Sequence, residues 1–321
     1  MLKKILFCFH NPNLIPIFVS IMKVKFLLLL LLLPLFYFAQ SKIRYKYELL
    51  GGIGTTNFLG DLGGANQVGT HFLRDYDFKA TRPLISVGGR YRPHRKFAFK
   101  AMLEMGIVAG KDSYTKDIYR QNRNLSFSSP IIELSAQAEY YFIGENRTNL
   151  YRISGVKGKK KRKYTMYAAT GIGVFFYSPS AKYDGKRYSL RKLHTEGQGL
   201  EGGPKQYSNF NICIPIALGY NYIIDSRWSI GAELGFRKTF TDYIDDVSGT
   251  YYDKALLKQN YGDIAVALAD PSLDLLPTAT MPNGDGSGAQ RGETKHKDSY
   301  MFLEFNVNYK LTKKTRTRSK F

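Results

Sequence analysis

The sequence predicts an all-β fold, an eight-stranded antiparallel transmembrane barrel of the outer-membrane kind with long extracellular loops. Three observations lead to this prediction: the composition, a secretory signal near the N-terminus, and an alternation of apolar and polar residues that recurs along the chain. The 321 residues include 24 Tyr, 21 Phe and 30 Gly but only two Cys. Such a composition favours many short strands and turns over helices.

The first 40 residues have the layout of a leader that ends in a signal peptide. Met22 opens the stretch MKVKFLLLLLLLPLFYFAQ, in which two lysines precede an apolar run over residues 26–38 and the small residue Ala39. The run is too short and too close to the N-terminus for a spanning helix, and it matches a secretory signal. Residues 1–21 are an extension from an upstream start codon or part of a longer leader.

The predicted organisation is a leader over 1–40, a barrel over 41–311 and a basic periplasmic tail over 312–321. The whole chain carries a formal charge of +21, and the leader contains four lysines and no acid, so +17 remains on the exported part. Basic excess fits nucleic acid, anionic lipid or an acidic protein, and export argues against nucleic acid. Cys213 is the one cysteine after the leader, so no intrachain disulfide is expected.

Apolar residues alternate with small, polar or charged ones in eight segments of about ten residues, the length that a tilted strand needs to cross a bilayer. The alternation is strict in five segments and weaker, with many glycines, in three. The strict segments are 97–107, 132–142, 210–222, 228–236 and 301–311, and the weaker ones are 45–55, 84–92 and 166–177.

Two architectures fit such alternation. A soluble sandwich or lipocalin-like barrel has its apolar face inside, whereas a membrane barrel has it outside, and the composition of the polar face distinguishes them. This face carries charges of both signs, and eight strands enclose an interior that side chains just fill. Aromatic residues at the strand ends match an interfacial girdle. We therefore expect a salt-bridge plug in the lumen, with a proton or ion pathway as the alternative. The predicted lumen charge network comprises Lys100, Glu104, Glu133, Glu139, Glu233, Arg237, Glu304 and Lys310.

Connection lengths predict which end of the barrel faces outward. The short turns 93–96 and 225–227 are expected in the periplasm, and the long connections 56–83, 109–130, 178–208 and 241–299 outside. With an even number of strands, both termini then lie in the periplasm of an outer-membrane protein.

One connection, 143–163, is long although it falls on the periplasmic side, and it ends in the basic run KGKKKRK. Runs of like charge are commonly interaction segments. We expect this run to dock an acidic partner, the alternatives being contact with anionic cell-wall polymers or a solvated rim. The predicted docking residues are Lys157, Lys159, Lys160, Lys161, Arg162 and Lys163.

The stretch TFTDYIDDVSGTYYD at 239–253 gathers carboxylates in a basic chain. Asp242, Asp245 and Asp246 lack the alternating rhythm of a calcium loop. We expect them, together with Asp61, to form the folding latch of an extracellular loop. Asp242 or Asp245 would bond local amides or pair with Arg291. A calcium or partner contact is the alternative.

No catalytic residue, metal site or cofactor is predicted. The four histidines after the leader fall in separate loops or turns, and HTEGQGL at 194–200 lacks the H-E-x-x-H pair of a metalloprotease. Ser189 and His194 share one loop, which is the basis of the enzyme alternative, a small lipid-modifying barrel. A serine and a histidine in one loop are a common coincidence.

Four motifs in order carry a resemblance: GIGTTNFLGDLGG at 52–64, HTEGQGL, RKTFTDYIDDVSGTYYD at 237–253 and QRG at 290–292. Over about residues 45–311, the chain resembles the PorG-like outer-membrane barrels of Bacteroidetes. The resemblance implies a non-enzymatic component of the type IX secretion and gliding machinery. Its partners would be outer-membrane lipid and a periplasmic ring built from a lipoprotein and a second protein. That family also contains paralogues, for which surface adhesion or envelope integrity is the alternative role.

Overall fold

A computed structural model describes residues 46–62, 78–145, 162–273 and 288–311. The predicted leader, the tail 312–321 and the lysines at 157, 159, 160 and 161 lie outside these residues. Within the described part, no helix is long and apolar enough to cross a membrane.

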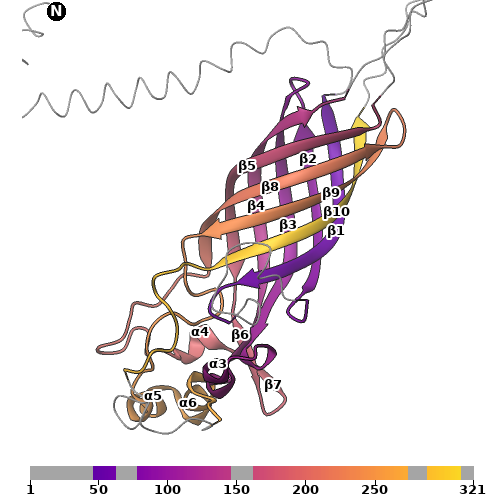
Figure 1. The fold of residues 1–321 in the computed structure, drawn as a ribbon. Coiled ribbons are helices and arrows are strands. Elements are labelled where there is room, and N and C mark those ends of the chain that lie inside the picture. The colour runs from indigo at the N-terminus through magenta and orange to yellow at the C-terminus, as the bar shows by residue number, and fades with distance from the viewer. Residues whose placement is uncertain (1–45, 63–77, 146–161, 274–287, 312–321) are drawn as a thin grey trace, which may run out of the picture. The chain divides into compact units, whose positions relative to one another are not determined.

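Eight long strands form a closed antiparallel barrel, which confirms the predicted fold (Figure 1). The sheet order is β3-β2-β1-β10-β9-β8-β5-β4, and pairing of β3 with β4 closes the cylinder. The barrel strands are β1 Tyr47–Leu59, β2 Arg82–Tyr91, β3 Phe97–Lys111, β4 Ser126–Ile143, β5 Tyr164–Tyr177, β8 Phe210–Ile223, β9 Trp228–Thr239 and β10 Ser299–Leu311.

The barrel is apolar outside and polar inside, the reverse of a soluble domain. In β4, Leu134 is 63% exposed while its neighbour Glu133 is fully buried. Because successive side chains of a strand point to opposite faces, the alternation in the sequence becomes an apolar exterior around a charged interior. An apolar exterior of this kind is stable when lipid surrounds it.

An aromatic girdle surrounds one end of the barrel. Neighbouring rings touch there: the centroids of Tyr47 and Tyr91 lie 5.1 Å apart, and those of Trp228 and Tyr309 lie 4.7 Å apart. Amphipathic rings collect at the boundary between lipid and water, so the girdle marks that boundary. Every barrel strand contributes to it, through Tyr47, Tyr91, Phe97, Tyr140, Tyr164, Tyr220, Trp228 and Tyr309.

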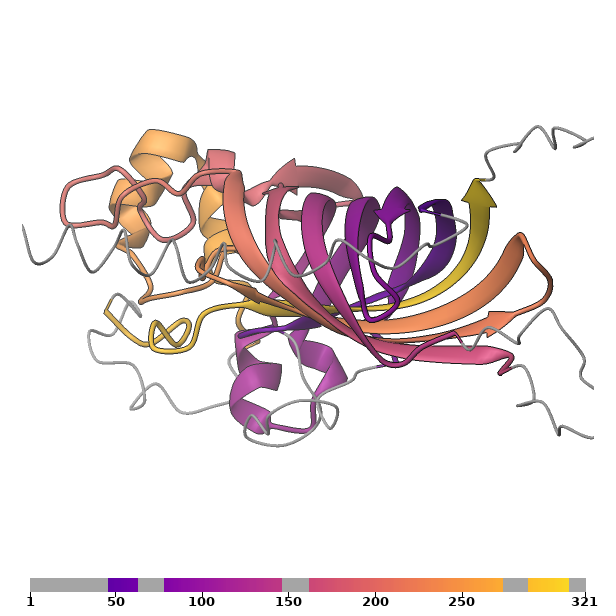
Figure 2. The same ribbon diagram turned by 90° about the horizontal axis from the view of Figure 1, so that it is seen from above.

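The connections give the two ends different characters. The girdle end, here called the turn end, has short links at 92–96 and 224–227. The opposite end, the loop end, carries the described helices and one hairpin, as Figures 1 and 2 show. These elements are η3 Asp112–Tyr114, α3 Ile118–Arg123, β6 Ser180–Tyr183, β7 Lys186–Ser189, α4 Leu190–Leu193, α5 Lys254–Tyr261 and α6 Asp263–Ala269.

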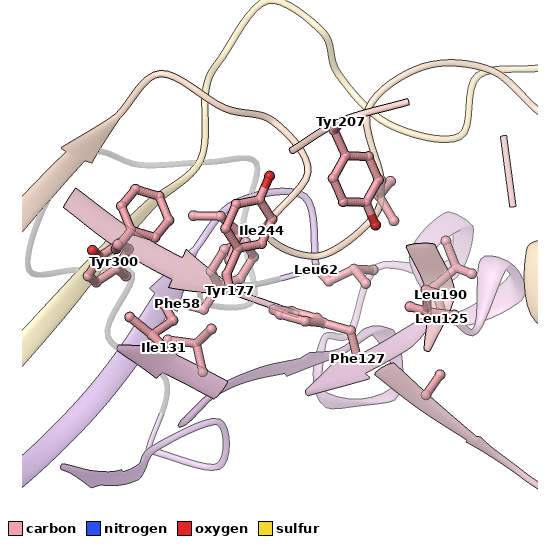
Figure 3. Close-up of a cluster of buried hydrophobic side chains, with 14 of the residues drawn as sticks. Phe58, Leu62, Leu125, Phe127, Ile131, Tyr177, Leu190, Tyr207, Ile244 and Tyr300 are labelled. Carbon is pink, nitrogen blue, oxygen red and sulfur yellow. The ribbon is translucent and has the colours of Figure 1, made fainter. Parts of the chain in front are cut away.

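An apolar cluster closes the lumen at the loop end (Figure 3). There the inward faces of the strands change from charged to aromatic, and side chains from the loops pack onto them. Burial of this area stabilises the loops against the barrel at about 25 cal/mol per Å². The strands supply Phe58, Phe127, Ile131, Tyr177 and Tyr300, and the loops supply Leu62, Leu125, Leu190, Tyr207 and Ile244.

Candidate functional site

Ion pairs fill the barrel interior and neutralise glutamates that face one another across neighbouring strands. Glu104 and Glu133 stand directly opposite each other in the β3–β4 pairing, where two like charges destabilise a sheet. Arg237 reaches across from β9 and contacts both, at 2.5 Å from Glu104 and 3.3 Å from Glu133. The hydroxyl of Tyr300 also donates to Glu133, at 2.9 Å.

A second facing pair is Glu233 of β9 and Glu304 of β10. Glu233 is held by the ammonium group of Lys100 at 2.6 Å and by the hydroxyl of Tyr167 at 2.5 Å. Glu304 instead accepts a hydrogen bond from the hydroxyl of Ser86 at 2.6 Å. Among the described residues, no cation lies within ion-pair distance of Glu304.

Toward the turn end the lumen holds a third group, which sequence reasoning missed. Arg90 bonds Glu48 at 2.9 Å and lies 2.7 Å from Glu139. Arg92 lies 3.7 Å from Glu48 and donates to the hydroxyl of Tyr141 at 2.7 Å. Glu48, Arg90 and Arg92 occupy inward positions of 45–55 and 84–92, two of the three weaker, glycine-containing segments. The same parity, extended to these segments, therefore predicts them.

The structure places all eight residues of the predicted lumen network inside the barrel, each 4% exposed or less. Lys310 stands apart from the others at the turn end, where it bonds Glu145 at 3.1 Å. Charges in a low-dielectric interior are tolerated when they are paired and hydrogen-bonded, and all but Glu304 have an ionic partner. The arrangement has the form of a plug.

Replacing Arg237 by methionine is expected to lower the free energy of unfolding by about 3–5 kcal/mol, because two facing carboxylates lose their shared cation. The triple variant R237M/E104Q/E133Q removes the repulsion as well and should recover most of the loss. The measurement is urea unfolding in lipid vesicles, followed by the heat-modifiable migration of the folded barrel. Wild-type stability of the single variant would contradict the bridging role, and Glu304→Gln, which removes no ion pair, is the matched control.

At the loop end, the four sequence motifs meet in one buried cluster, here called the latch. Arg291 lies at its centre and bonds the carboxylate of Glu196 at 2.9 Å and the backbone carbonyl of Asp246 at 2.6 Å. Glu196 in turn accepts from the backbone amides of Ser248 at 2.9 Å and Gly249 at 3.2 Å. Segments far apart in the sequence are thereby joined.

The acidic stretch is folded into the latch by amide and hydroxyl donors. Asp245 accepts from the amides of Val247 at 3.0 Å and Leu62 at 3.1 Å, so of the two expectations for Asp245 the structure shows local amide bonding. The carboxylate of Asp246, whose φ is +65°, accepts from the hydroxyls of Thr195 and Tyr207. Arg291 pairs with Glu196, and its contact to the acidic stretch is to a carbonyl.

The remaining predicted acids lie at the edge of the latch. Asp242 accepts from the hydroxyl of Ser248 at 2.6 Å and has Lys297 at 3.7 Å. Asp61 accepts from the amide of Glu293 at 2.8 Å. Lys297 thus ties the acidic stretch, and Glu293 ties the 52–64 motif, to the segment just before β10.

Sequence reasoning missed several members of the latch. Asp298 accepts from the amide of Ile244 at 2.9 Å. Arg123 of α3 bonds Asp112 at 2.8 Å and donates to the carbonyl of Arg291 at 2.5 Å. Glu196 lies within HTEGQGL, and nothing in that motif alone indicates that its carboxylate pairs with Arg291. No sequence signal pointed to Arg123 or Asp112, because each acts through contacts that only the tertiary fold creates.

The latch is not arranged as a metal centre. In the described part of the chain, no group of three or more His, Cys, Asp or Glu side chains is placed to hold a metal ion. The polar atoms of the latch are instead directed at one another.

Burial makes the latch sensitive to pH. Removal from water raises the pKa of Asp246 to about 6 in spite of Arg291, and raises that of Asp61 to about 6 as well. Burial raises the pKa of Asp245 and Asp298 well above the ordinary range, with added repulsion from Asp61 on Asp245 and from Asp245 on Asp298. The folded latch therefore holds protons that the same carboxyl groups release when the loop unfolds.

The latch is expected to be more stable near pH 5 than near pH 7.5. A folded pKa of about 6 for Asp246 lies above the ordinary value of 3.8. Stability is thus full below the ordinary value and is lost as the pH rises through about 6. The measurement is hydrogen-exchange protection of the Ser248 and Gly249 amides, corrected for intrinsic exchange. Protection that rises with pH would contradict the account. Asp246→Asn should reduce the dependence without abolishing it, because Asp61, Asp245 and Asp298 still titrate.

The two residues of the enzyme alternative, Ser189 and His194, make separate contacts. The imidazole of His194 stacks on Tyr261 with centroids 4.4 Å apart, and its Nδ1 contacts the carbonyl of Gln198. Ser189 precedes α4 and pairs with Ser180 across the hairpin. Among the described residues, no hydrogen bond joins the Ser189 hydroxyl to His194.

Comparison with known proteins gives a family. A family model described as a domain of unknown function, DUF6089, matches residues 24–266. The chain belongs to this family. A comparison with curated proteins gives no match.

Solved outer-membrane barrels show weak likenesses to the chain. Neisserial surface protein A is 8% identical, with 83% of this chain and 97% of that chain covered, at a TM-score of 0.36. Ail of Yersinia pestis, solved with the heparin analogue sucrose octasulfate, is 7% identical, with 84% and 100% covered, at 0.37. OprG of Pseudomonas aeruginosa is 8% identical, with 84% and 97% covered, at 0.37. These likenesses are too weak to carry an argument, and the barrel fold rests on the strand pairing above.

Proposed function

We propose that this DUF6089 barrel is a non-enzymatic accessory or anchoring component of the type IX secretion and gliding machinery. The observation that supports this proposal most strongly is the latch. The four motifs that resemble the PorG-like family come from three separate connections of the barrel, and their residues bond to one another in one buried cluster. A set of motifs with one shared structural role supports a common ancestry more strongly than four unrelated short matches.

The filled interior of the barrel favours a role as a scaffold over a role as a channel for secreted protein. Ion pairs fill the lumen, and an apolar cluster and the latch cover its loop end. Eight strands enclose only enough room for side chains. A barrel filled in this way anchors other proteins at the membrane, and export of protein cargo belongs to another component.

In the proposed orientation the turn end faces the periplasm together with both termini, and the loop end faces outward. The basic run then lies on the periplasmic side. Of its residues, the structure describes Arg162 and the exposed Lys163, which immediately precede β5. The guanidinium of Arg162 lies 5.8 Å from the ring centroid of Tyr164, a residue of the girdle. We infer that this run docks an acidic face of the periplasmic ring.

Deletion of the gene is expected to abolish secretion of type IX cargo and gliding, as measured in culture supernatants and on agar. Normal secretion and gliding in the deletion strain would contradict the proposal. Altered adhesion or detergent sensitivity alone would favour a paralogue for surface adhesion or envelope integrity. For the lipid-modifying alternative, a changed lipid composition that Ser189→Ala and His194→Ala reproduce would be decisive.

Changing Lys157, Lys159, Lys160, Lys161, Arg162 and Lys163 to glutamine should weaken co-purification of the periplasmic ring at least tenfold, because the docking charge is lost. The control changes six exposed lysines at the loop end to glutamine: Lys116, Lys186, Lys192, Lys205, Lys258 and Lys295. Equal recovery of the ring with both variants would contradict docking by the basic run.

A further inference from the structure

A half-open cavity of about 410 Å³ lies at the loop end, between the rim of the barrel and the β6–β7 hairpin. Its size falls within the range of small-molecule sites. The inner wall is mostly apolar and is formed by Leu62, Leu125, Leu190, Val247 and Leu268. These residues belong to the cap that covers the lumen or to α6 beside it.

The charged side chains at this cavity that have no ionic partner among the described residues are positive. Lys111, the last residue of β3, and Lys182 of β6 both line it. Among the described residues, neither lysine has a carboxylate within ion-pair distance. The other charged groups that line it are committed elsewhere: Asp270 pairs with Lys254 at 2.6 Å, Asp245 accepts two backbone amides, and Arg291 pairs with Glu196.

The hairpin adds to this positive charge. Lys182 stands directly opposite Arg187 in the β6–β7 pairing, an arrangement in which like charges destabilise the pair. Arg187 donates to the hydroxyl of Ser180 at 3.1 Å, and neither cation has an acid beside it in the described residues. An anion bound at Lys182 would relieve the repulsion.

One residue of the cavity lining, Lys111, lies on the side of β3 that faces lipid. Met105 and Ile107 of β3 are exposed on the lipid face, and Lys111 points to the same face four residues farther along the strand. The hairpin is attached to the barrel through the pairing of Ser180 with Ser128 of β4. An amphiphile dissolved in the bilayer therefore reaches the mouth without crossing the barrel.

We propose that this cavity binds a single-chain anionic amphiphile. The alkyl chain packs on the leucine wall, and Lys111 and Lys182 hold a phosphate or carboxylate head group at the mouth. The apolar wall supplies affinity by burial, and the two ammonium groups select the sign of the head group. This site is independent of the proposed secretion role, because its residues lie at the loop end and outside the basic run.

The test is a titration of the full-length barrel in zwitterionic nanodiscs with octyl phosphate, monitored by methyl NMR shifts of Leu62, Leu125 and Leu190. We expect saturable shifts in the wild type. In K111Q/K182Q the midpoint should rise at least tenfold, while the control Lys205→Gln, an exposed loop-end lysine outside the cavity, should keep the wild-type midpoint. Heat-modifiable migration establishes that each variant is folded.

Three further ligands separate the parts of the proposal. Inorganic phosphate alone and octyltrimethylammonium should produce no saturable shift at these methyl groups, whereas octanoate should behave as octyl phosphate does. Equal binding of the cationic and anionic amphiphiles would overturn the proposal. So would a wild-type midpoint in K111Q/K182Q, or saturation by inorganic phosphate alone.

Discussion

Pairing of charges inside a cylinder that faces lipid is the constraint on which the rest of this structure depends. Two glutamate pairs, Glu104 with Glu133 and Glu233 with Glu304, face each other across neighbouring strands. An unpaired charge in such an interior costs several kcal/mol, so cations must come from elsewhere in the barrel. Arg237 and Lys100 supply them from β9 and β3. The barrel closes stably only if these cations also fill its lumen.

Buried charges at the loop end are also paired, but there hydrogen bonds from amides and hydroxyls replace part of the ion pairing. Arg291 binds a carboxylate from another connection, that of Glu196, and a carbonyl from its own connection, that of Asp246. An apolar cluster of loop and strand side chains packs beside them. Loops built in this way carry their own small core, unlike surface loops in general. The filled lumen and the fastened loops make the loop end a packed, hydrogen-bonded cap.

The sequence was most informative where a short-range rule applies. Parity along each strand separates Leu134 from Glu133 and predicts both the lipid face and the lumen charges. In the glycine-containing segments the alternation is weak, and it does not make Glu48, Arg90 and Arg92 evident. Parity also does not say which cation meets which acid, because that depends on the closure of the barrel. The bond between Arg291 and Glu196 joins residues 95 positions apart, and no local pattern predicts such a partner.

Planar-bilayer recording on the purified wild-type barrel tests the central claim most directly. If ion pairs and the apolar cap fill the lumen, the inserted protein should show no conductance above that of the bare bilayer, at voltages of either sign. Stable stepwise currents from correctly folded, heat-modifiable protein would show an open lumen and would contradict the plug.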